Sequence, residues 1–350
     1  MKKTVIIFTT LLCLAACGRT VTTSKHEADK RSFDAWVTVY KEQHPEYLWK
    51  QTTLGSWILE DIPGTGELIT GTEDTVYVFA NHTIRNTSDK ITSTSVAKVA
   101  QQLGTYDEVR YYGPTVWYHN GSYAGLEEMI NGMRDGGRRK VAIPGWLLTY
   151  KRYGSPEKYL NDSTTNSPVI YDIELVEHFR NTNEWELDSI GRYLARNYSK
   201  YFGKTPAAAR ADSSGAHGFY YASLQAPTSK EALKDTVVYI NYTGRLLNGK
   251  VFDTTIRDIA IDNGLYRSSR TYQPVAVRYG TSLSDIKMGD GEGTKVKEGF
   301  ARIMNSMKAG EKGIGFFYSP LGYSTSGSGN KIPPYSPLCF EVELVKNPND

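Results

Sequence analysis

Two stretches of this chain carry the same landmarks in the same order, and this internal repeat limits the possible folds more than any other feature. Each landmark in the first half has a counterpart in the second half, at an offset that stays between 161 and 169 residues. The pairs are Gly55 and Gly218, DTV at 74–76 and at 235–237, and DIEL at 172–175 with EVEL at 341–344. A tandem repeat of one domain explains this spacing, and 350 residues suffice for two domains.

The apolar periodicity predicts the same succession of elements in each repeat. An amphipathic helix comes first, then strands, then a short helix with an apolar face, and finally a closing strand. The expected ranges are helices at 32–43, 122–133, 184–202 and 294–308, strands at 55–62, 218–224 and 338–344, a hairpin at 240–255, and a linker at 205–218. Gly310 is expected to end the last helix. Strands wrapped around one short helix make an α+β half-barrel.

The N-terminus is expected to be a targeting segment. Lys2 and Lys3 precede an apolar run at 5–16, which is too short to span a bilayer comfortably. The run ends in LAACG at 14–18, which resembles the lipobox of bacterial lipoproteins. That resemblance implies a signal peptide at 1–16, acylation of Cys17 with chains such as palmitate, and a lipidated tether at 17–30. The alternative is an ordinary secretory signal with an incidental cysteine.

Charge and cysteine content restrict the partners. Lys2 and Lys3 are two of the 41 basic residues, and the remaining ones exceed the 38 acidic residues by one. This balance gives no electrostatic case for nucleic acid. Cys13 leaves with the signal and Cys17 carries lipid, so Cys339 stays as a lone, buried thiol that cannot form an internal disulfide.

The end of the chain is its most informative motif. Residues 332–334 read Ile-Pro-Pro and lead into a strand whose Leu338, Phe340, Val342 and Leu344 share one face. Upstream, the hairpin at 240–255 ends in a Phe-Asp pair. Together these motifs resemble the active site of FKBP-type peptidyl-prolyl isomerases. The resemblance implies two FKBP-like domains, each an antiparallel half-barrel sheet wrapped around a short helix and preceded by a helix.

The resemblance also implies the domain limits and the site. The N-terminal domain with its leading helix would span 31–180, a helix and linker 181–217, and the C-terminal isomerase domain 218–350. Carried over position by position, the pocket would contain Tyr242, Phe252, Asp253, Val296, Phe300, Tyr323, Ile332 and Phe340. The aromatic and aliphatic members would form the walls, Tyr323 and the backbone around Ile332 would hold the peptide, and Asp253 would lie near the reacting carbonyl.

This chemistry needs no acid or base. Rotation about an X-Pro bond must break amide resonance, at a barrier of ~18–20 kcal/mol. The twisted amide is less dipolar than the planar one, so an apolar pocket that excludes water favours the transition state. Asp253 stands out, because a carboxylate directly after a core phenylalanine has no packing role. Taken singly, each aromatic residue could instead be plain core.

The second repeat departs from the family at several positions. Phe300 replaces the usual tryptophan, Lys297 stands where isoleucine is usual, and Val275 stands where phenylalanine is frequent. Two segments, at 256–273 and 285–295, are expected to be insertions that either cover the pocket or extend it.

The first repeat is expected to keep the frame and lose the pocket. Ala80 or Asn81 stands in place of the hairpin tyrosine, and a polar run at 92–95 replaces the Phe-Asp pair. Leu126 replaces the floor aromatic, and residues 167–169 replace the Ile-Pro-Pro turn, with Tyr150 or Tyr153 as a substitute for the loop tyrosine. This pattern predicts a non-catalytic, degenerate domain; a diverged active site is the alternative.

The whole pattern predicts a peptidyl-prolyl cis–trans isomerase (EC 5.2.1.8) that assists the folding of exported proteins in the cell envelope. Its partners would be proline-containing unfolded polypeptides and, through the lipid, a membrane; Gly18 favours an outer-membrane protein facing the periplasm. The rivals are a non-catalytic binding module or chaperone and an adhesion protein. The six histidines are scattered, so neither a metal nor a cofactor is expected.

Overall fold

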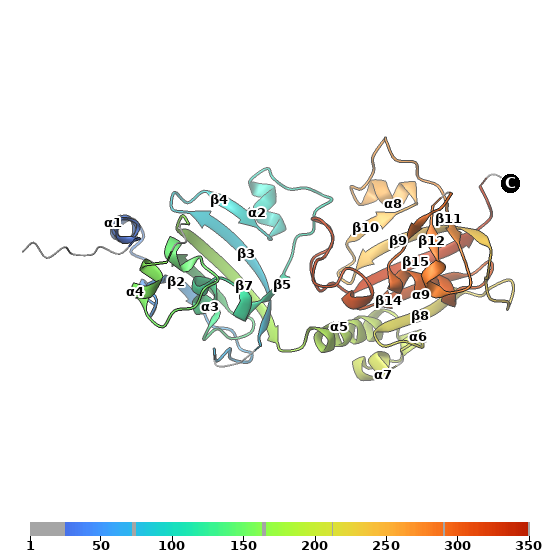
Figure 1. The fold of residues 1–350 in the computed structure, drawn as a ribbon, viewed down its shortest axis with the longest axis horizontal. Helices are drawn as coiled ribbons and strands as arrows, with labels where there is room; N and C mark the ends of the chain where they lie inside the picture. The colour runs from blue at the N-terminus through green and yellow to red at the C-terminus, as the bar shows by residue number, and fades with distance from the viewer. Residues whose placement is uncertain (1–24, 72–74, 163–165, 212, 290, 349–350) are drawn as a thin grey trace, which may run out of the picture.

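The chain folds into two domains, each built on one antiparallel sheet (Figure 1). The computed structural model describes residues 25–71, 75–162, 166–211, 213–289 and 291–348. The order of strands is β1-β2-β6-β7-β3-β4 in the first sheet and β13-β12-β11-β9-β15-β14-β8 in the second; β5 pairs with β3, and β10 with β9. The α+β class and the two half-barrel sheets are as predicted. Within the described ranges, no helix is long and apolar enough to cross a membrane.

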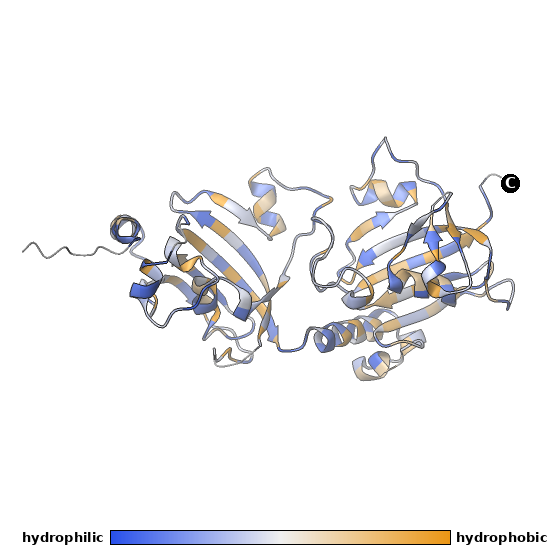
Figure 2. Ribbon diagram, viewed as in Figure 1, coloured by the Kyte–Doolittle hydropathy of each residue, from blue (hydrophilic) through white to orange (hydrophobic). Residues whose placement is uncertain are grey.

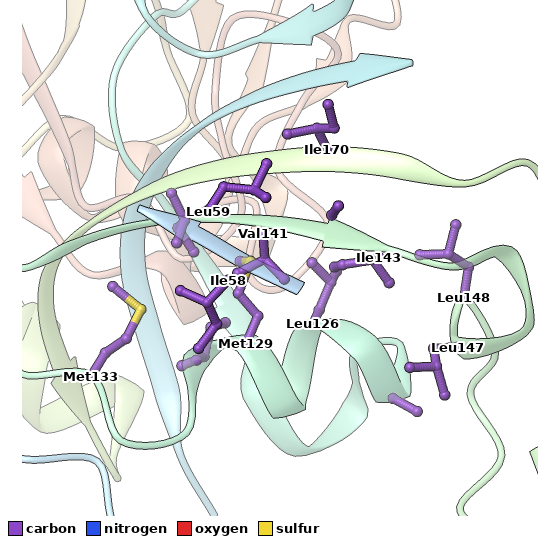
Figure 3. Packing of buried hydrophobic residues seen from close by; sticks show 14 of the residues in the cluster. Ile58, Leu59, Leu126, Met129, Met133, Val141, Ile143, Leu147, Leu148 and Ile170 are labelled. Atoms are coloured by element: carbon purple, nitrogen blue, oxygen red, sulfur yellow. The ribbon is translucent and has the colours of Figure 1, made fainter. Parts of the chain in front are cut away.

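The first domain packs a short helix against its sheet. Its strands are β1 (Lys50–Gln51), β2 (Trp57–Ile62), β3 (Tyr77–Asn86), β4 (Ile91–Thr94), β5 (Thr115–Tyr118), β6 (Arg138–Ile143) and β7 (Val169–Phe179). Its helices are α1 (Glu27–Gln43), α2 (Ala97–Gln102), α3 (Ala124–Ile130) and α4 (Pro156–Leu160), with short 3₁₀ turns η1 (His119–Gly121) and η2 (Gly145–Leu147). Figure 3 shows Leu126 and Met129 of α3 directed at apolar side chains of β2 and β6, which makes α3 the centre of this core.

In the second domain, side chains from other elements pack on both faces of the sheet. Its strands are β8 (Phe219–Gln225), β9 (Val237–Leu246), β10 (Val251–Thr254), β11 (Val275–Arg278), β12 (Lys287–Met288), β13 (Thr294–Lys295), β14 (Lys312–Phe317) and β15 (Leu338–Val345). Its helices are α8 (Arg257–Asp262) and α9 (Glu298–Ser306), with 3₁₀ turns η3 (Leu283–Asp285) and η4 (Ser319–Leu321). The strands alternate in hydropathy along their length (Figure 2), which suits a sheet with two distinct faces.

Strand β15 divides its side chains between these two faces. Leu338, Phe340 and Val342 pack with α9 in one cluster, and Leu344 packs against its edge. Cys339 points the other way, into a cluster with Leu187 and other residues of α5 (Thr182–Asn197). The predicted common face of the last strand is therefore confirmed, and Cys339 is a buried free thiol.

Helices between the two domains cover the outer face of the second sheet. Asn181 caps α5, because its side chain accepts hydrogen bonds from the backbone N–H groups of residues 183 and 184. The predicted helix at 184–202 is broken at Tyr198, and α6 (Ser199–Phe202) follows. The predicted linker contains a further helix, α7 (Pro206–Ala211), which packs on α5 and buries Ala209.

Several helix ends differ from the predicted ones. Helix α1 begins at Glu27, inside the segment expected to be a tether. Helix α9 is shorter than predicted because Lys297 and Met307 are extended at its two ends, with ψ values of 148° and 153°. Residues 294 and 295 belong to β13 instead, and Gly310 lies in the turn before β14, with φ at 70°. Periodicity alone could not locate these ends, since apolar positions continue past them.

The repeat extends to individual hydrogen bonds. In the first domain the hydroxyls of Thr83 and Thr94 are 2.9 Å apart, and in the second those of Thr243 and Thr254 are 3.0 Å apart. Helices α2 and α8 follow these pairs at the same offset. The segment at 256–273, expected to be an insertion relative to the family, therefore begins with a helix that has a counterpart in the first domain.

The two domains touch along the loop that carries the Ile-Pro-Pro motif. The backbone N–H of Tyr111 donates to the backbone oxygen of Asn330 at 2.8 Å. The rings of Tyr77 and Tyr335 meet edge to face, with centroids 5.7 Å apart. Val109 is buried in a small cluster with residues of β10 and α8. Figure 1 shows the corresponding turquoise and dark-red segments side by side between the sheets.

Candidate active site

A cavity of about 430 Å³ opens between α9, the hairpin of β9 and β10, and the loop after β14. All eight predicted pocket residues line it: Tyr242, Phe252, Asp253, Val296, Phe300, Tyr323, Ile332 and Phe340. They come from five separate segments of the chain. The rest of the lining is formed by Met288, Lys295, Lys297, Phe317, Ser328, Lys331 and Leu338. Val275 packs against the same core without lining the cavity.

Phe340 lies at the centre of the aromatic lining. Its ring meets those of Phe252 and Phe300 edge to face, with centroids 5.5 Å and 5.1 Å apart, and stacks on Phe317 at 5.9 Å. Offset and edge-to-face contacts of this kind fix ring positions. Since all four rings are buried, the base of the cavity is a rigid apolar surface.

Gly244 on β9 makes this aromatic packing possible. A Cβ atom at residue 244 would lie 2.7 Å from ring atoms of both Phe252 and Phe340. In the first domain the register of the paired strands puts Ile84 at the matching position and Thr92 in place of Phe252. The ring of Phe252 therefore needs a glycine at residue 244, and the first domain has neither the glycine nor the phenylalanine.

Three polar side chains form a chain of hydrogen bonds at one edge of the cavity. The hydroxyl of Tyr242 donates to Oδ2 of Asp253 at 2.6 Å, and Nη1 of Arg270 donates to Oδ1 at 2.7 Å. Burial, and then the charge of Asp253, hold the pKa of Tyr242 far above its usual range. The hydroxyl therefore stays protonated, and the carboxylate is held in one orientation as an acceptor.

Arg270 was not among the predicted site residues, and it lies in the segment expected to be an insertion relative to the family. A signal was present, because the pattern Tyr-x-x-x-Arg-x-Tyr occurs at 106–112 and again at 266–272. In both copies the two tyrosine rings stack, at 5.0 Å and 5.5 Å, and the guanidinium lies over the second ring. The second expected insertion, at 285–295, contributes Met288 and Lys295 and so extends the pocket.

Tyr323 and Ile332 come from the long loop between β14 and β15. Burial, followed by the charge of Asp253, raises the pKa of Tyr323, so this hydroxyl also stays protonated as a donor. Residue 332 exchanges two backbone hydrogen bonds with Ser328, at 2.7 Å and 3.2 Å. Those bonds occupy its backbone, so the buried side chain of Ile332 is the part that meets the cavity.

The first domain has a different set of residues at the matching positions. Strand register aligns Tyr242 with His82, so the expectation of Ala80 or Asn81 is wrong by one or two residues. Ser93 takes the position of Asp253, and its hydroxyl is 3.4 Å from Nε2 of His82. Leu126 matches Phe300, because each follows a glycine in the same surroundings. Gly125 packs on Ile143, the last residue of β6, and Gly299 packs on Phe317, the last residue of β14.

The remaining predictions for the first domain fall partly outside the described residues. Residues 167 and 168 align by register with 336 and 337, and the Ile-Pro-Pro positions fall at 163–165, outside the described ranges. Tyr150 is exposed and packs its ring on Tyr123 at 4.5 Å, whereas Tyr153 contacts Tyr159. Cys17 also lies outside the described residues. Among the residues described, no group of three or more His, Cys, Asp or Glu is placed to hold a metal ion.

The second domain has a half-barrel sheet wrapped around one short helix, with an aromatic pocket between them. This is the fold expected of an FKBP-type prolyl isomerase. The sequence profile described as FKBP-type peptidyl-prolyl cis-trans isomerase matches residues 228–345. Over 129 residues the chain is 30% identical to the FK506-binding protein of Neisseria meningitidis serogroup B, covering 37% of this chain and 95% of that relative. The chain therefore belongs to the FKBP-type peptidyl-prolyl isomerase family, and it is an enzyme of class EC 5.2.1.8.

Other relatives match over the same part of the chain. Peptidyl-prolyl cis-trans isomerase Mip of Chlamydia muridarum is 32% identical over 111 residues, which are 32% of this chain and 33% of Mip. Among solved structures, FkpA from Escherichia coli has 21% identity and a TM-score of 0.29, covering 45% of this chain and 63% of FkpA. The structure of the three FKBP domains of wheat FKBP73 has 17% identity and a TM-score of 0.28, and the match covers 83% of this chain and 92% of the wheat chain. Scores this low say nothing about the arrangement of the domains.

Proposed function

We propose that the pocket beneath α9 is where this enzyme isomerises X-Pro bonds. The observation that carries the proposal is the meeting of eight separately predicted residues around one cavity. The buried rings of Phe252, Phe300 and Phe340 would enclose the proline ring and keep water from the twisting amide. The rotated amide loses dipolar character, so moving it out of water lowers the barrier.

The polar groups would orient the peptide in this pocket. The protonated hydroxyl of Tyr323 would donate to a substrate carbonyl, and the carboxylate of Asp253, held by Tyr242 and Arg270, would face the carbon of the rotating carbonyl. A tenfold acceleration needs only about 1.4 kcal/mol, so each of these contacts can matter. The side chains of Ile332 and Val296 would complete the walls of the pocket.

The test is a protease-free assay of cis–trans exchange in a short X-Pro peptide, with the purified full chain. We expect acceleration by the parent protein and a loss of roughly tenfold in kcat/KM for Asp253→Ala and for Tyr323→Phe. Both side chains are partly exposed, so the fold should survive, and circular dichroism verifies this. A parent protein no faster than the buffer would overturn the proposal, and preserved suppression of aggregation would then favour a chaperone.

We further propose that the first domain is non-catalytic and serves spacing, substrate holding or partner contact. What supports this is the replacement of Phe252 and Asp253 by Thr92 and Ser93 at matching register positions. Neither side chain supplies a ring wall or a carboxylate. Residual exchange activity after both second-domain substitutions, lost on altering His82, would contradict it.

We also propose that the protein works in the cell envelope on exported polypeptides, held by acyl chains on Cys17 and facing the periplasm from the outer membrane. The support is the LAACG motif at 14–18 together with relatives named Mip. Each buried CH₂ of an acyl chain contributes ~0.8 kcal/mol, so two or more chains give stable anchoring. Labelled palmitate should enter the parent and Cys13→Ala but not Cys17→Ala. A Cys17→Ala protein that stays labelled and membrane-bound would refute the anchor.

A further inference from the structure

Three lysines surround the opening of the pocket. Lys295 lies on β13, Lys297 precedes the first turn of α9, and Lys331 precedes the Ile-Pro-Pro motif; all three line the cavity. Lys295 and Lys297 are exposed, and Lys331 is half-buried. The opening thus has positive charges contributed by three separate segments.

Two carboxylates near these lysines are already engaged. Asp253, the only acidic residue of the described lining, bonds to Tyr242 and Arg270. Glu298, next to Lys297, is bonded by the guanidinium of Arg302 at 2.7 Å. Among the described residues, none of the three lysines forms an ion pair. Their charge at the opening is therefore not neutralised by an ion pair within the described part of the chain.

The local contacts keep two of these lysines over the cavity. Nζ of Lys297 lies 4.7 Å from the centroid of the Tyr323 ring, a cation–π contact with the tyrosine expected to hold substrate. Nζ of Lys331 donates to the backbone oxygen of Phe252 at 3.4 Å, on the opposite wall. Both ammonium groups therefore flank the path of a peptide whose proline occupies the pocket.

The matching position in the first domain has no such charge. Because the glycines at 125 and 299 are equivalent, Lys297 aligns with Tyr123, whose ring packs on Tyr150. The positive opening is thus a feature of the second domain and its pocket.

We propose that this enzyme prefers X-Pro segments with an aspartate or glutamate directly before or after the proline. The proposal rests on the proposed function of the same pocket. A carboxylate at either position extends from the peptide toward the lysines, while the proline ring fills the apolar base. Exposed ion pairs give modest energies that salt screens, so the preference is expected to be about three- to tenfold at low ionic strength.

The test compares two peptide series with the full chain, Ala-Xaa-Pro-Phe and Ala-Ala-Pro-Xaa, with Xaa as Glu, Gln or Lys. The ratio of kcat/KM for Glu over Gln should be about three to ten in at least one series, and below one for Lys over Gln. The Glu/Gln ratio should fall toward one in ~0.5 M NaCl, because salt screens the attraction. Using a ratio cancels effects of the peptide backbone and of enzyme concentration.

Variants then assign the preference to the lysines. The triple variant K295Q/K297Q/K331Q should bring the Glu/Gln ratio to about one, and the triple arginine variant should keep it. Lys312→Gln is the matched control, since Lys312 is paired with Glu341 away from the cavity and should keep the ratio. Equal acceleration of the Glu and Gln peptides by the parent overturns the charge preference and leaves the isomerase assignment intact. No acceleration of any peptide overturns the proposed function itself.

Discussion

At the residue scale, the pocket depends on close contacts between rings that leave no room for additional atoms. Phe340 touches four other rings, and Gly244 provides the space in which the rings of Phe252 and Phe340 meet. The sequence pattern identified Phe252, Phe300 and Phe340, because the resemblance assigns each one a position, but it did not identify Phe317. It did not identify Gly244, since a glycine inside a strand has no meaning until its neighbours across the sheet are known.

Gly244→Ala tests this packing. The added Cβ would lie 2.7 Å from ring atoms of Phe252 and Phe340, so the rings must move. We expect a loss of ~1–3 kcal/mol in the free energy of unfolding and a lower kcat/KM. Urea denaturation measures the first. Gly154→Ala is the matched control, since an added Cβ there meets nothing within 4 Å; equal stability of both variants would contradict the packing described.

At the element scale, helix α5 is bonded to the loop that carries Tyr323. The carboxylate of Glu186 is buried, and it accepts hydrogen bonds from the backbone N–H of Ser319 at 2.5 Å and from its hydroxyl at 2.7 Å. Burial outweighs these bonds and raises the pKa of Glu186 to about 7. The helix therefore holds η4 through a group that titrates near neutrality.

Glu186→Gln should change how stability depends on pH. Because the folded pKa of about 7 is above the usual 4.5, Glu186 favours the folded state below pH 4.5, and this contribution is lost as pH rises through 7. The loss amounts to at most about 3 kcal/mol. Glutamine keeps an acceptor and does not ionise, so the variant should gain stability relative to the parent between about pH 5 and about pH 8.

Urea unfolding at about pH 5 and about pH 8, followed by the fluorescence of the adjacent Trp185, measures the stability of Glu186→Gln relative to the parent. Glu184→Gln, on an exposed part of the same helix and bonded to Arg210, is the control and should show no such trend. A constant difference between Glu186→Gln and the parent at all pH values would show that Glu186 does not titrate in this range.

The elements that frame each domain could be predicted, but several short strands and helices and the limits of most elements could not. Strands β2, β8, β9, β10 and β15 and the two central helices follow from apolar periodicity, which depends only on neighbouring residues. The end of α9 depends on the extended conformation of Lys297 and Met307, which β13 and the next turn impose. The match of His82 to Tyr242 required the strand register, because an offset of one residue cannot be seen in a sequence without pairing partners.

At the scale of the whole molecule, the first domain contacts the loop of the second domain's pocket. Tyr111 bonds to Asn330, and Val109 is buried against β10 and α8. None of this could be predicted from the sequence, because it joins residues more than 100 positions apart through surfaces that only the folded domains create. The contact implies that the first domain stabilises the loop at residues 328–335.

Val109→Asp should weaken this contact. A carboxylate in an apolar cluster must be desolvated, so the cluster is expected to open. Hydrogen exchange should then become faster for the backbone amides of residues 328 and 332, while amides of the central strand β15 keep their protection. Val39→Asp, at an exposed position on α1, is the control. Unchanged exchange in the loop of Val109→Asp would contradict the stabilising role.

Only one of the two sibling domains is proposed to carry the catalytic pocket, and a pair of matched double substitutions distinguishes the two domains. The measurement is kcat/KM of the full chain for an X-Pro peptide, in the double variant F252A/D253A and in its first-domain counterpart T92A/S93A. We expect a loss of roughly a hundredfold in F252A/D253A and an activity within a factor of two of the parent in T92A/S93A. Equal activities in the two variants, or a loss confined to T92A/S93A, would contradict it.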